Sequence, residues 1–313
     1  MRNAFIDELV IHAEKNPNIA LIVGDLGFSV IEPFADRFPD RFINAGVAEQ
    51  NMAGLAAGMA SEGYHAFIYS IANFPTFRCA EQIRNDIDYH KLSVTIVAVG
   101  GGLAYGNLGY SHHAIQDYAF MRSLPNMLIA SPGDPMEVRA CMRYIIENPQ
   151  PSYLRLGKAG EEIFHQSVPN ISPGKWLLVR HGDAYAETFL TTGATLQLAH
   201  DLISSNSILS NRAIHSLPMW GMSSKHLQAK QVASISSVLT LEDHLIDGGF
   251  GSWMLESLIL NPNLISKIKI KSLDPIVCGM VGKQETLNCA GGLTSHIESE
   301  QNSVIKSKVN QFK

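Results

Sequence analysis

The sequence predicts an α/β protein made of two parallel-sheet-based α/β domains, and three observations lead to this prediction. The chain has 313 residues, about twice the usual length of one domain. Its composition is that of an ordinary globular protein, with 46% hydrophobic and 17% charged residues. Short β-branched runs alternate with helical patterns, which is typical of βαβ units around a parallel sheet that is buried on both faces.

The first half of the chain carries six short runs that we expect to be strands. They span residues 19–25, 41–46, 65–70, 93–100, 126–132 and 152–157. The clearest helix between them begins near residue 133. Asp134 can cap this helix, and Pro135 is tolerated in the first turn because the N–H it lacks would have no partner there.

The periodic pattern is lost near residue 158, where Pro, Gly and Ser collect and indicate a linker. We therefore expect a first domain over residues 1–160, a linker over 161–175 and a second α/β domain over 176–313. Strands of the second domain are expected at 186–193, 236–243 and 268–275.

Charge and hydropathy exclude several classes of partner. The chain has 24 Lys and Arg against 29 Asp and Glu, so it lacks the chain-wide excess of basic residues that is typical of nucleic-acid-binding proteins, and we expect no nucleic-acid partner. No apolar run approaches the ~20 residues that span a bilayer, and the first residues do not resemble a signal peptide. We expect a cytoplasmic protein without a membrane partner. The four cysteines have no zinc spacing and are expected to be reduced thiols.

Glu49 lies at the start of a helical pattern, in the stretch "RFINAGVAEQNMAGLAAGMA". Ligands of open parallel sheets bind beyond the carboxyl ends of the strands, so the loop that carries Glu49 is a candidate site. Apolar neighbours would raise the pKa of this carboxyl, whereas the helix N-terminus would lower it. Both outcomes stay open, and a simple helix-stabilising role is the alternative.

Two further loops follow predicted strands. In "SIANFPTFR", Ile71, Phe74 and Phe77 recur every three residues and would share one face, either as core or as a platform for a flat ring. The glycine-rich loop 100–113 ends with His112 and His113. Histidine suits proton transfer near neutral pH, although a loop histidine can also be a plain surface residue.

Several segments together resemble one family. In order and spacing, the chain is similar to the pyrimidine-binding domain of transketolases, and the likeness continues into the second domain, so it covers essentially the whole chain. The segments are "RFINAGVAEQNMAGLAAGMASEG", "YSIANFPTFRCAEQIRND", "LGYSHHAIQD", "RSLPNMLIASPGD", "YLRLGK", "LTTGAT", "LEDH" and "GGFGS". The resemblance implies transfer of a two-carbon ketol unit between a ketose and an aldose, with thiamine diphosphate as cofactor.

The resemblance also implies roles for individual residues. Glu49 matches the glutamate that hydrogen-bonds the aminopyrimidine ring of thiamine diphosphate and, when protonated, favours its imino tautomer. Phe74 matches the aromatic residue that stacks on this ring, with Ile71 and Phe77 at the flanking positions. The family often has aromatic residues at both flanks, so Ile71 is a departure. His112 matches the histidine that touches the donor sugar.

Other positions are implied less directly. Asp25, in "VGDLG", matches an aspartate near the cofactor, and His113 is expected to contact substrate beside its neighbour. Lys158 stands at or near a basic position that anchors phosphate, where an amine acts as a point charge. Many transketolases have an acidic residue where Leu108 stands, which leaves the acceptor open. Arg155 lies inside a predicted strand and is expected to be structural.

One expected motif is missing. Thiamine diphosphate enzymes of this type bind Mg²⁺ through a GDG motif, but Gly-Asp occurs here only as "GDL", "GDP" and "GDA". We therefore expect the C-terminal half of a split, two-subunit transketolase that is inactive alone. A separate N-terminal subunit would supply the Mg²⁺ and diphosphate site, and two chains of each kind would form a heterotetramer with the cofactor at the interface.

Three alternatives share part of this pattern. The β-subunit of a 2-oxo acid dehydrogenase E1 component has the same two-domain plan and the glutamate, but "AEQNM" and "GYSHHAIQD" resemble transketolase segments. A 1-deoxyxylulose-5-phosphate synthase is normally one long chain. A regulatory subunit that kept the fold without the chemistry is the third. The donor and acceptor sugars, and whether they are phosphorylated, stay open.

Overall fold

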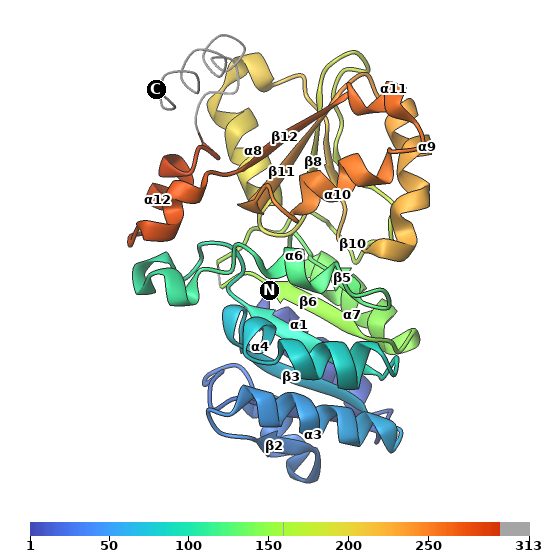
Figure 1. The fold of residues 1–313 in the computed structure, drawn as a ribbon, viewed down its shortest axis with the longest axis vertical. Coiled ribbons are helices and arrows are strands. Elements are labelled where there is room, and N and C mark those ends of the chain that lie inside the picture. The colour runs from blue at the N-terminus through green and yellow to red at the C-terminus, as the bar shows by residue number, and fades with distance from the viewer. Residues whose placement is uncertain (159, 295–313) are drawn as a thin grey trace.

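The computed structural model describes residues 1–158 and 160–294 and folds them into two α/β domains. The domains are stacked one above the other in Figure 1, where the lower is built on a seven-stranded sheet and the upper on a five-stranded sheet. The predicted pair of α/β domains is thus confirmed.

Six of the seven strands in the first sheet are parallel, and all six were predicted within three residues at either end. The sheet order is β10-β5-β6-β4-β3-β1-β2. The seventh strand, β10, pairs antiparallel with β5 and comes from beyond the expected linker, so the sheet is mixed and not fully parallel. The strands are β1 (Ile19–Val23), β2 (Phe42–Asn44), β3 (His65–Ile71), β4 (Val94–Val99), β5 (Leu128–Ala130), β6 (Ser152–Leu156) and β10 (Met219–Trp220).

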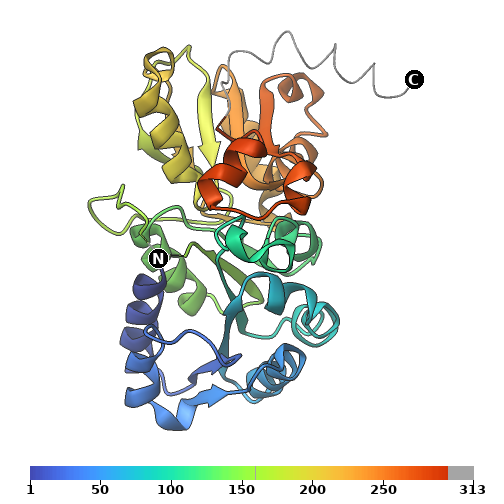
Figure 2. The same ribbon diagram turned by 90° about the vertical axis from the view of Figure 1, so that its left-hand side faces the viewer.

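Helices cover both faces of this sheet, which explains the continuous apolar runs of its strands. Along β1, Leu21 and Val23 pack in one core cluster with Phe5 of α1, whereas Ile22 points to the other face and packs with Met52 of α3. Figure 2 shows α1 in dark blue on one side of the sheet and α3 in lighter blue on the other. The helices of this domain are α1 (Arg2–Ala13), α2 (Glu32–Arg37), α3 (Glu49–Ser61), α4 (Asn73–Phe77), α5 (Ala80–Gln82), α6 (Asp117–Met121) and α7 (Pro135–Glu147).

The predicted cap of α7 is confirmed. The backbone N–H of Glu137 donates to Oδ1 of Asp134 over 2.7 Å, and Pro135 is the first residue of the helix. The other carboxylate oxygen of Asp134 accepts from the backbone N–H groups of Phe164 and His165, at 2.8 and 3.1 Å. One capping residue therefore also holds the segment that leads to the second domain.

The second sheet has the order β12-β11-β8-β9-β7. All its neighbouring pairs are parallel except β7 with β9, and the three predicted strands are present. Strands β7 and β9 were not predicted, because their runs are short and only partly apolar. The strands are β7 (Leu177–Arg180), β8 (Thr188–Thr191), β9 (Ile214–Ser216), β11 (Val238–Leu245) and β12 (Ile268–Leu273), and the helices are α8 (Thr195–Ser205), α9 (Gln228–Ala233), α10 (Phe250–Ser257), α11 (Pro262–Ile265) and α12 (Gln284–Ala290).

The two domains meet through buried aromatic rings. Trp220 of β10 lies with its ring centroid 5.1 Å from that of Tyr118 in α6 and 5.2 Å from that of Trp253 in α10. Such aromatic pairs each contribute about 0.5–1.5 kcal/mol beyond their buried area. Residues 160–175 contain no helix or strand. The second domain therefore packs directly on the first and even adds a strand to its sheet.

In the part of the chain that the structure describes, no helix has both the length and the apolar character needed to cross a membrane. The four cysteines are free thiols, as predicted. Two of them, Cys79 and Cys141, are buried, and burial raises the pKa of each thiol.

Candidate active site

Three loops meet at the carboxyl edge of the first sheet, where parallel strands place their ligand-binding loops. Glu49 is the first residue of α3 and follows β2. Phe74 lies in α4, directly after β3. His112 ends the short 3₁₀ helix η4 (Tyr110–His112) in the long loop after β4. Side chains that are far apart in the sequence are therefore neighbours in the fold.

Glu49 is buried, with 3% of its surface exposed, and it has a charged partner. Nη1 of Arg78 donates to Oε2 of Glu49 over 2.9 Å, while the Arg78 side chain remains half-exposed. A cavity of about 460 Å³ opens beside the two side chains. Its other lining residues are Val47, Ala48, Gln50 and Asn51.

Ring contacts extend this pair to the histidine. The Arg78 guanidinium carbon lies 4.2 Å from the centroid of the Phe74 ring. The Phe74 ring in turn meets the His112 ring edge to face, with 5.1 Å between centroids. Glu49, Arg78, Phe74 and His112 thus form one continuous chain of contacts, which we call the site chain.

The surroundings of His112 orient its ring and tune its charge. Nδ1 lies 3.0 Å from Oγ of Ser111, and the side-chain amide of Asn73 donates to the Ser111 carbonyl over 2.9 Å. Partial burial, the charge of Arg78 and the neighbouring His113 lower the pKa of His112. A neutral imidazole near pH 7 has one nitrogen that donates and one that accepts, so it suits a sugar hydroxyl.

Three predicted cofactor contacts lie near the site chain without joining it. Ile71 is half-buried at the end of β3, and Phe77 is 43% exposed at the end of α4. Asp25 is exposed, and its Oδ1 accepts from the side-chain amide of Asn44 over 3.0 Å. The preceding Gly24 is closer to Glu49, since a Cβ added to Gly24 would lie 3.8 Å from the Glu49 Cγ.

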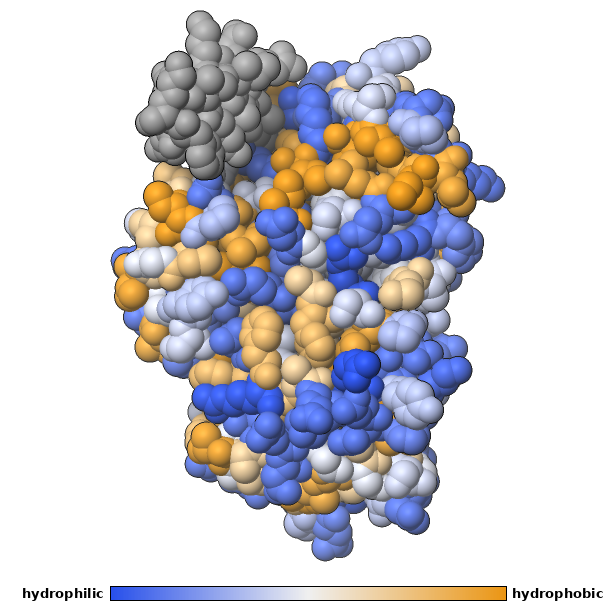
Figure 3. Space-filling view, in the orientation of Figure 1, coloured by the Kyte–Doolittle hydropathy of each residue, from blue (hydrophilic) through white to orange (hydrophobic). Residues whose placement is uncertain are grey.

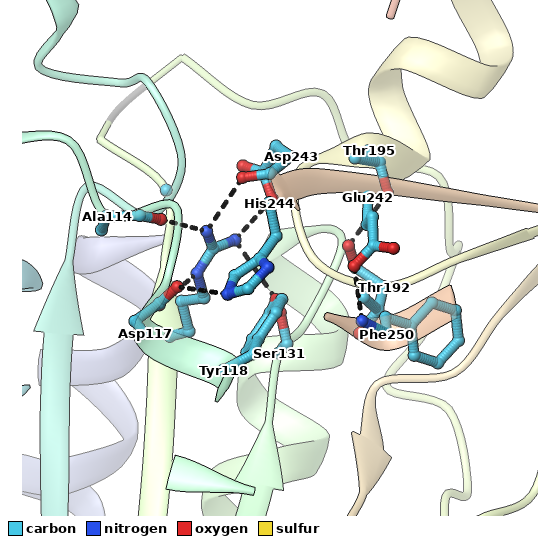
Figure 4. A network of polar contacts seen from close by, with 12 residues as sticks. Ala114, Asp117, Tyr118, Ser131, Thr192, Thr195, Glu242, Asp243, His244 and Phe250 are labelled. Atoms are coloured by element: carbon cyan, nitrogen blue, oxygen red, sulfur yellow. Dashed lines mark hydrogen bonds and ion pairs between the residues drawn. The ribbon is translucent and has the colours of Figure 1, made fainter. Parts of the chain in front are cut away.

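The two other predicted substrate residues, His113 and Lys158, lie in different surroundings from the site chain. His113 is 1% exposed, and its Nε2 lies 3.4 Å from the Gly106 carbonyl, which weighs against the predicted contact with substrate. Nζ of Lys158 lies 5.0 Å from the centroid of the Tyr105 ring, and Lys158 lines a different cavity of about 660 Å³. Arg155 is buried in an ion-pair network between the domains, in keeping with its expected structural role. Figure 4 labels its two acidic partners, Asp117 and Asp243.

The residues present fit the aminopyrimidine end of thiamine diphosphate. Oγ of Ser70 is buried and has no hydrogen-bond partner, and it lies close to Gly24 and hence to Glu49. A buried carboxyl, a free hydroxyl and the face of Phe74 match a flat heterocycle with polar edges. Within residues 1–158 and 160–294, no cluster of three or more His, Cys, Asp or Glu side chains could hold a metal ion.

Arg78 is the functional candidate that the sequence reasoning missed. It lies four residues after Phe74, and residues at this spacing share a helix face. That spacing next to the predicted aromatic platform was the available signal. Its pairing with Glu49, 29 residues away, depends on how β3 places the two loops.

Comparison with known proteins agrees with this geometry. The family described as transketolase, pyrimidine binding domain, matches residues 1–160. The chain belongs to the transketolase family. A putative transketolase C-terminal section of Methanocaldococcus jannaschii is 33% identical over 293 residues, covering 92% of this chain and 90% of that protein. One subunit of the apulose-4-phosphate transketolase of Phocaeicola vulgatus is 30% identical over 269 residues, covering 83% and 84%.

A solved structure indicates which part of a transketolase this chain corresponds to. A split-gene transketolase, solved as an inactive β4 tetramer, matches with a TM-score of 0.79 and 30% identity over 94% of this chain and 93% of that one. A 1-deoxy-D-xylulose-5-phosphate synthase of Clostridium perfringens is also 30% identical, but the match spans only 41% of its length. This transketolase chain therefore corresponds to the C-terminal section of a split enzyme.

Proposed function

We propose that this transketolase chain supplies the pyrimidine half of a thiamine diphosphate site. Together with a separate N-terminal subunit, it transfers a two-carbon ketol unit from a ketose to an aldose. The observation that carries the proposal is the site chain, which joins a buried carboxyl, an aromatic face and a neutral histidine at the carboxyl edge of the sheet.

Each member of the site chain has a task. When bound, thiamine diphosphate supplies the carbon nucleophile of ketol transfer. Glu49 holds a proton on its carboxyl and donates it in a hydrogen bond to the edge of the ring, so Arg78 must release the oxygen that it contacts. Phe74 offers its face to the ring, and the burial of Glu49 keeps water away from its carboxyl. His112 exchanges a hydrogen bond with a sugar hydroxyl.

We assign the Mg²⁺ and diphosphate site to the N-terminal subunit, in a heterotetramer of the cytoplasm. The missing GDG motif supports this assignment, as does the inactive β4 tetramer of the split-gene relative. Val47 and Phe28, which flank this edge of the sheet, are 74% and 69% exposed, as expected for surfaces that a partner covers. Figure 3 shows a further band of apolar side chains across the upper domain, which fits self-association.

The substrates proposed are sugar phosphates. The relative from Phocaeicola vulgatus is named for apulose 4-phosphate. Lys158 is exposed on the loop after β6, where its ammonium could neutralise a phosphate once the sugar is in place. Leu108 is 51% exposed on the His112 loop and brings no charge to the acceptor.

The decisive experiment is reconstitution. This chain, its N-terminal subunit and the mixture are assayed for ketol transfer with thiamine diphosphate and Mg²⁺. Only the mixture should be active, and Glu49→Gln should lower its kcat by about 10²-fold or more, the range of proton-transfer catalysis. Glu62→Gln, at an exposed position just after the same helix, is the matched control. Activity of this chain alone, or full activity of Glu49→Gln, would refute the proposal.

A further inference from the structure

The loop that carries His112 is closed at its base by a small backbone bridge. Gly102 and Ala114 each donate a backbone hydrogen bond to the other, both over 2.9 Å, as an isolated antiparallel pair. His112 lies two residues before Ala114. Whatever fixes this bridge therefore also fixes the position of the imidazole.

Arg155 of β6 holds the Ala114 side of the bridge. Nη2 of this buried side chain donates over 2.9 Å to the carbonyl of Ala114, which Figure 4 labels. Nε donates to Oδ2 of Asp117 over 2.7 Å, and Nη1 donates to Oδ1 of Asp243 over 2.6 Å. Because the guanidinium is planar and rigid, two carboxylates on different edges fix its orientation.

The carboxylate of Asp243 packs against the Gly102 side of the bridge, and it comes from β11 of the second domain. A Cβ on Gly102 would collide with Oδ2 of Asp243, so only glycine fits against this carboxylate. The φ angle of +64° at Gly102 also favours glycine. Two residues further along β11, the backbone N–H of Leu245 donates to the Ile115 carbonyl over 3.0 Å.

Water cannot replace these contacts, because the network is closed to solvent. The side chains of Arg155, Asp117 and Asp243 are 2%, 0% and 5% exposed. The His244 ring stacks on Tyr118 at the same place, with 5.2 Å between centroids. Removing one partner of such a network leaves a buried charge uncompensated, so its geometry is held tightly.

We propose that Arg155 and Asp243 are positioning residues for His112, through which the second domain sets the geometry of the sugar-binding loop. This inference rests on the proposed function of His112. Neither side chain is a member of the site chain, and both act through the Gly102–Ala114 bridge. A displacement of about 1 Å in a positioned group can lower a rate by about 100-fold.

Asp243→Asn tests the proposal in the full chain reconstituted with the N-terminal subunit. Asparagine keeps the size of the side chain but loses the charge that orients Arg155. The expected result is a fall in kcat of about 10-fold or more, with no change in the thiamine diphosphate concentration that gives half-maximal activity. Glu187→Gln is the matched control, because it removes the charge from the Arg212 ion pair elsewhere in the second domain.

A double-mutant cycle with His112→Ala separates positioning from general damage. If Asp243 acts through His112, Asp243→Asn will cause little further loss in the His112→Ala background. An equal loss in both backgrounds overturns the inference and leaves the proposed function intact. If His112→Ala alone keeps full activity, the proposed function of His112 fails, and the inference fails with it.

Gly102→Ala covers the case in which Asp243→Asn does not fold. It places a methyl group against Asp243 from the loop side and leaves every buried charge in place. The expected result is the same loss of kcat and the same non-additivity with His112→Ala. A fully active Gly102→Ala enzyme would overturn the inference.

Discussion

The Arg78 guanidinium donates to the buried carboxylate of Glu49 over 2.9 Å and at the same time lies over the ring of Phe74, 4.2 Å from its centroid. Both features that the proposed cofactor ring would use are therefore in contact with one half-exposed arginine. Binding of the ring must move Arg78 away from Glu49, and this exchange makes the arginine a sensitive point for experiments.

Arg78→Gln should increase the rise in Tm that thiamine diphosphate causes in the reconstituted complex. The substitution removes the ion pair from the cofactor-free protein only, because in the complex the ring takes over the Glu49 oxygen that Arg78 contacts. Since the arginine is half-exposed, the pair contributes at most about 1 kcal/mol to the free energy of unfolding. The measurement is thermal denaturation with and without cofactor.

Arg84→Gln is the control for this prediction, because Arg84 is exposed and its side chain contacts the neighbouring Asn85, away from the site chain. It should leave the cofactor-induced rise in Tm unchanged. A smaller rise in Arg78→Gln than in the wild type would show that the arginine contacts the bound cofactor, contrary to the exchange described above.

Arg78→Gln should also change the pH dependence of kcat/KM. Partial burial, the charge of Arg78 and His113 together lower the pKa of His112. Activity that needs a neutral His112 falls on the acid side of the profile, as this imidazole takes up a proton. Without the charge of Arg78 the pKa of His112 rises, so the acid limb moves to higher pH. An acid limb that stays in place would exclude His112 as the group that titrates.

The sequence predicted the first sheet well because its strands are buried on both faces and therefore read as continuous apolar runs. The two residues of β10, Met219 and Trp220, show no such run, and they pair with β5 about 90 residues earlier in the chain. The antiparallel edge strand β7 is only partly buried. These strands depend on how the domains pack, which a local pattern does not contain.

The candidate site was predictable only in part. The proximity of Glu49, Phe74 and His112 was predictable because each follows a strand, and parallel strands bring their loops to one edge. The partner of Glu49 was not predictable, because Arg78 reaches it only once β3 and α4 are placed. The orientation of His113 was not predictable either, since adjacent residues of a loop can face the core or the solvent.

Phe74→Ala should raise the concentration of thiamine diphosphate that gives half-maximal activity by about tenfold. An aromatic pair contributes about 0.5–1.5 kcal/mol beyond its buried area, and about 1.4 kcal/mol corresponds to a factor of ten. Phe74→Tyr keeps the ring face and should bind the cofactor normally. Tyr89→Ala, at a ring that is 76% exposed, is the surface control. Equal cofactor affinity in Phe74→Ala and the wild type would exclude stacking on this ring.

His165 and Glu137 connect the segment between the domains to the buried N-terminus of α7. Nε2 of His165 lies 3.0 Å from Oε1 of Glu137, whose other oxygen accepts from Oγ of Ser216 over 3.0 Å. Burial lowers the pKa of His165, but the hydrogen bond and the charge of Glu137 outweigh this effect and raise the pKa overall. Folding therefore favours the protonated imidazole.

His165→Gln should reduce stability more at low pH than at high pH. Because the pKa of His165 is raised in the folded protein, its contribution is complete below the usual value of 6.5 and is lost as the pH rises through the raised value. Near pH 6 the loss should be about 1.5 kcal/mol, typical of a hydrogen bond to a charged group. Urea denaturation from about pH 6 to 9 measures it, with His90→Gln at an exposed position as control. A loss that does not vary with pH would mean that the imidazole in this pair is uncharged.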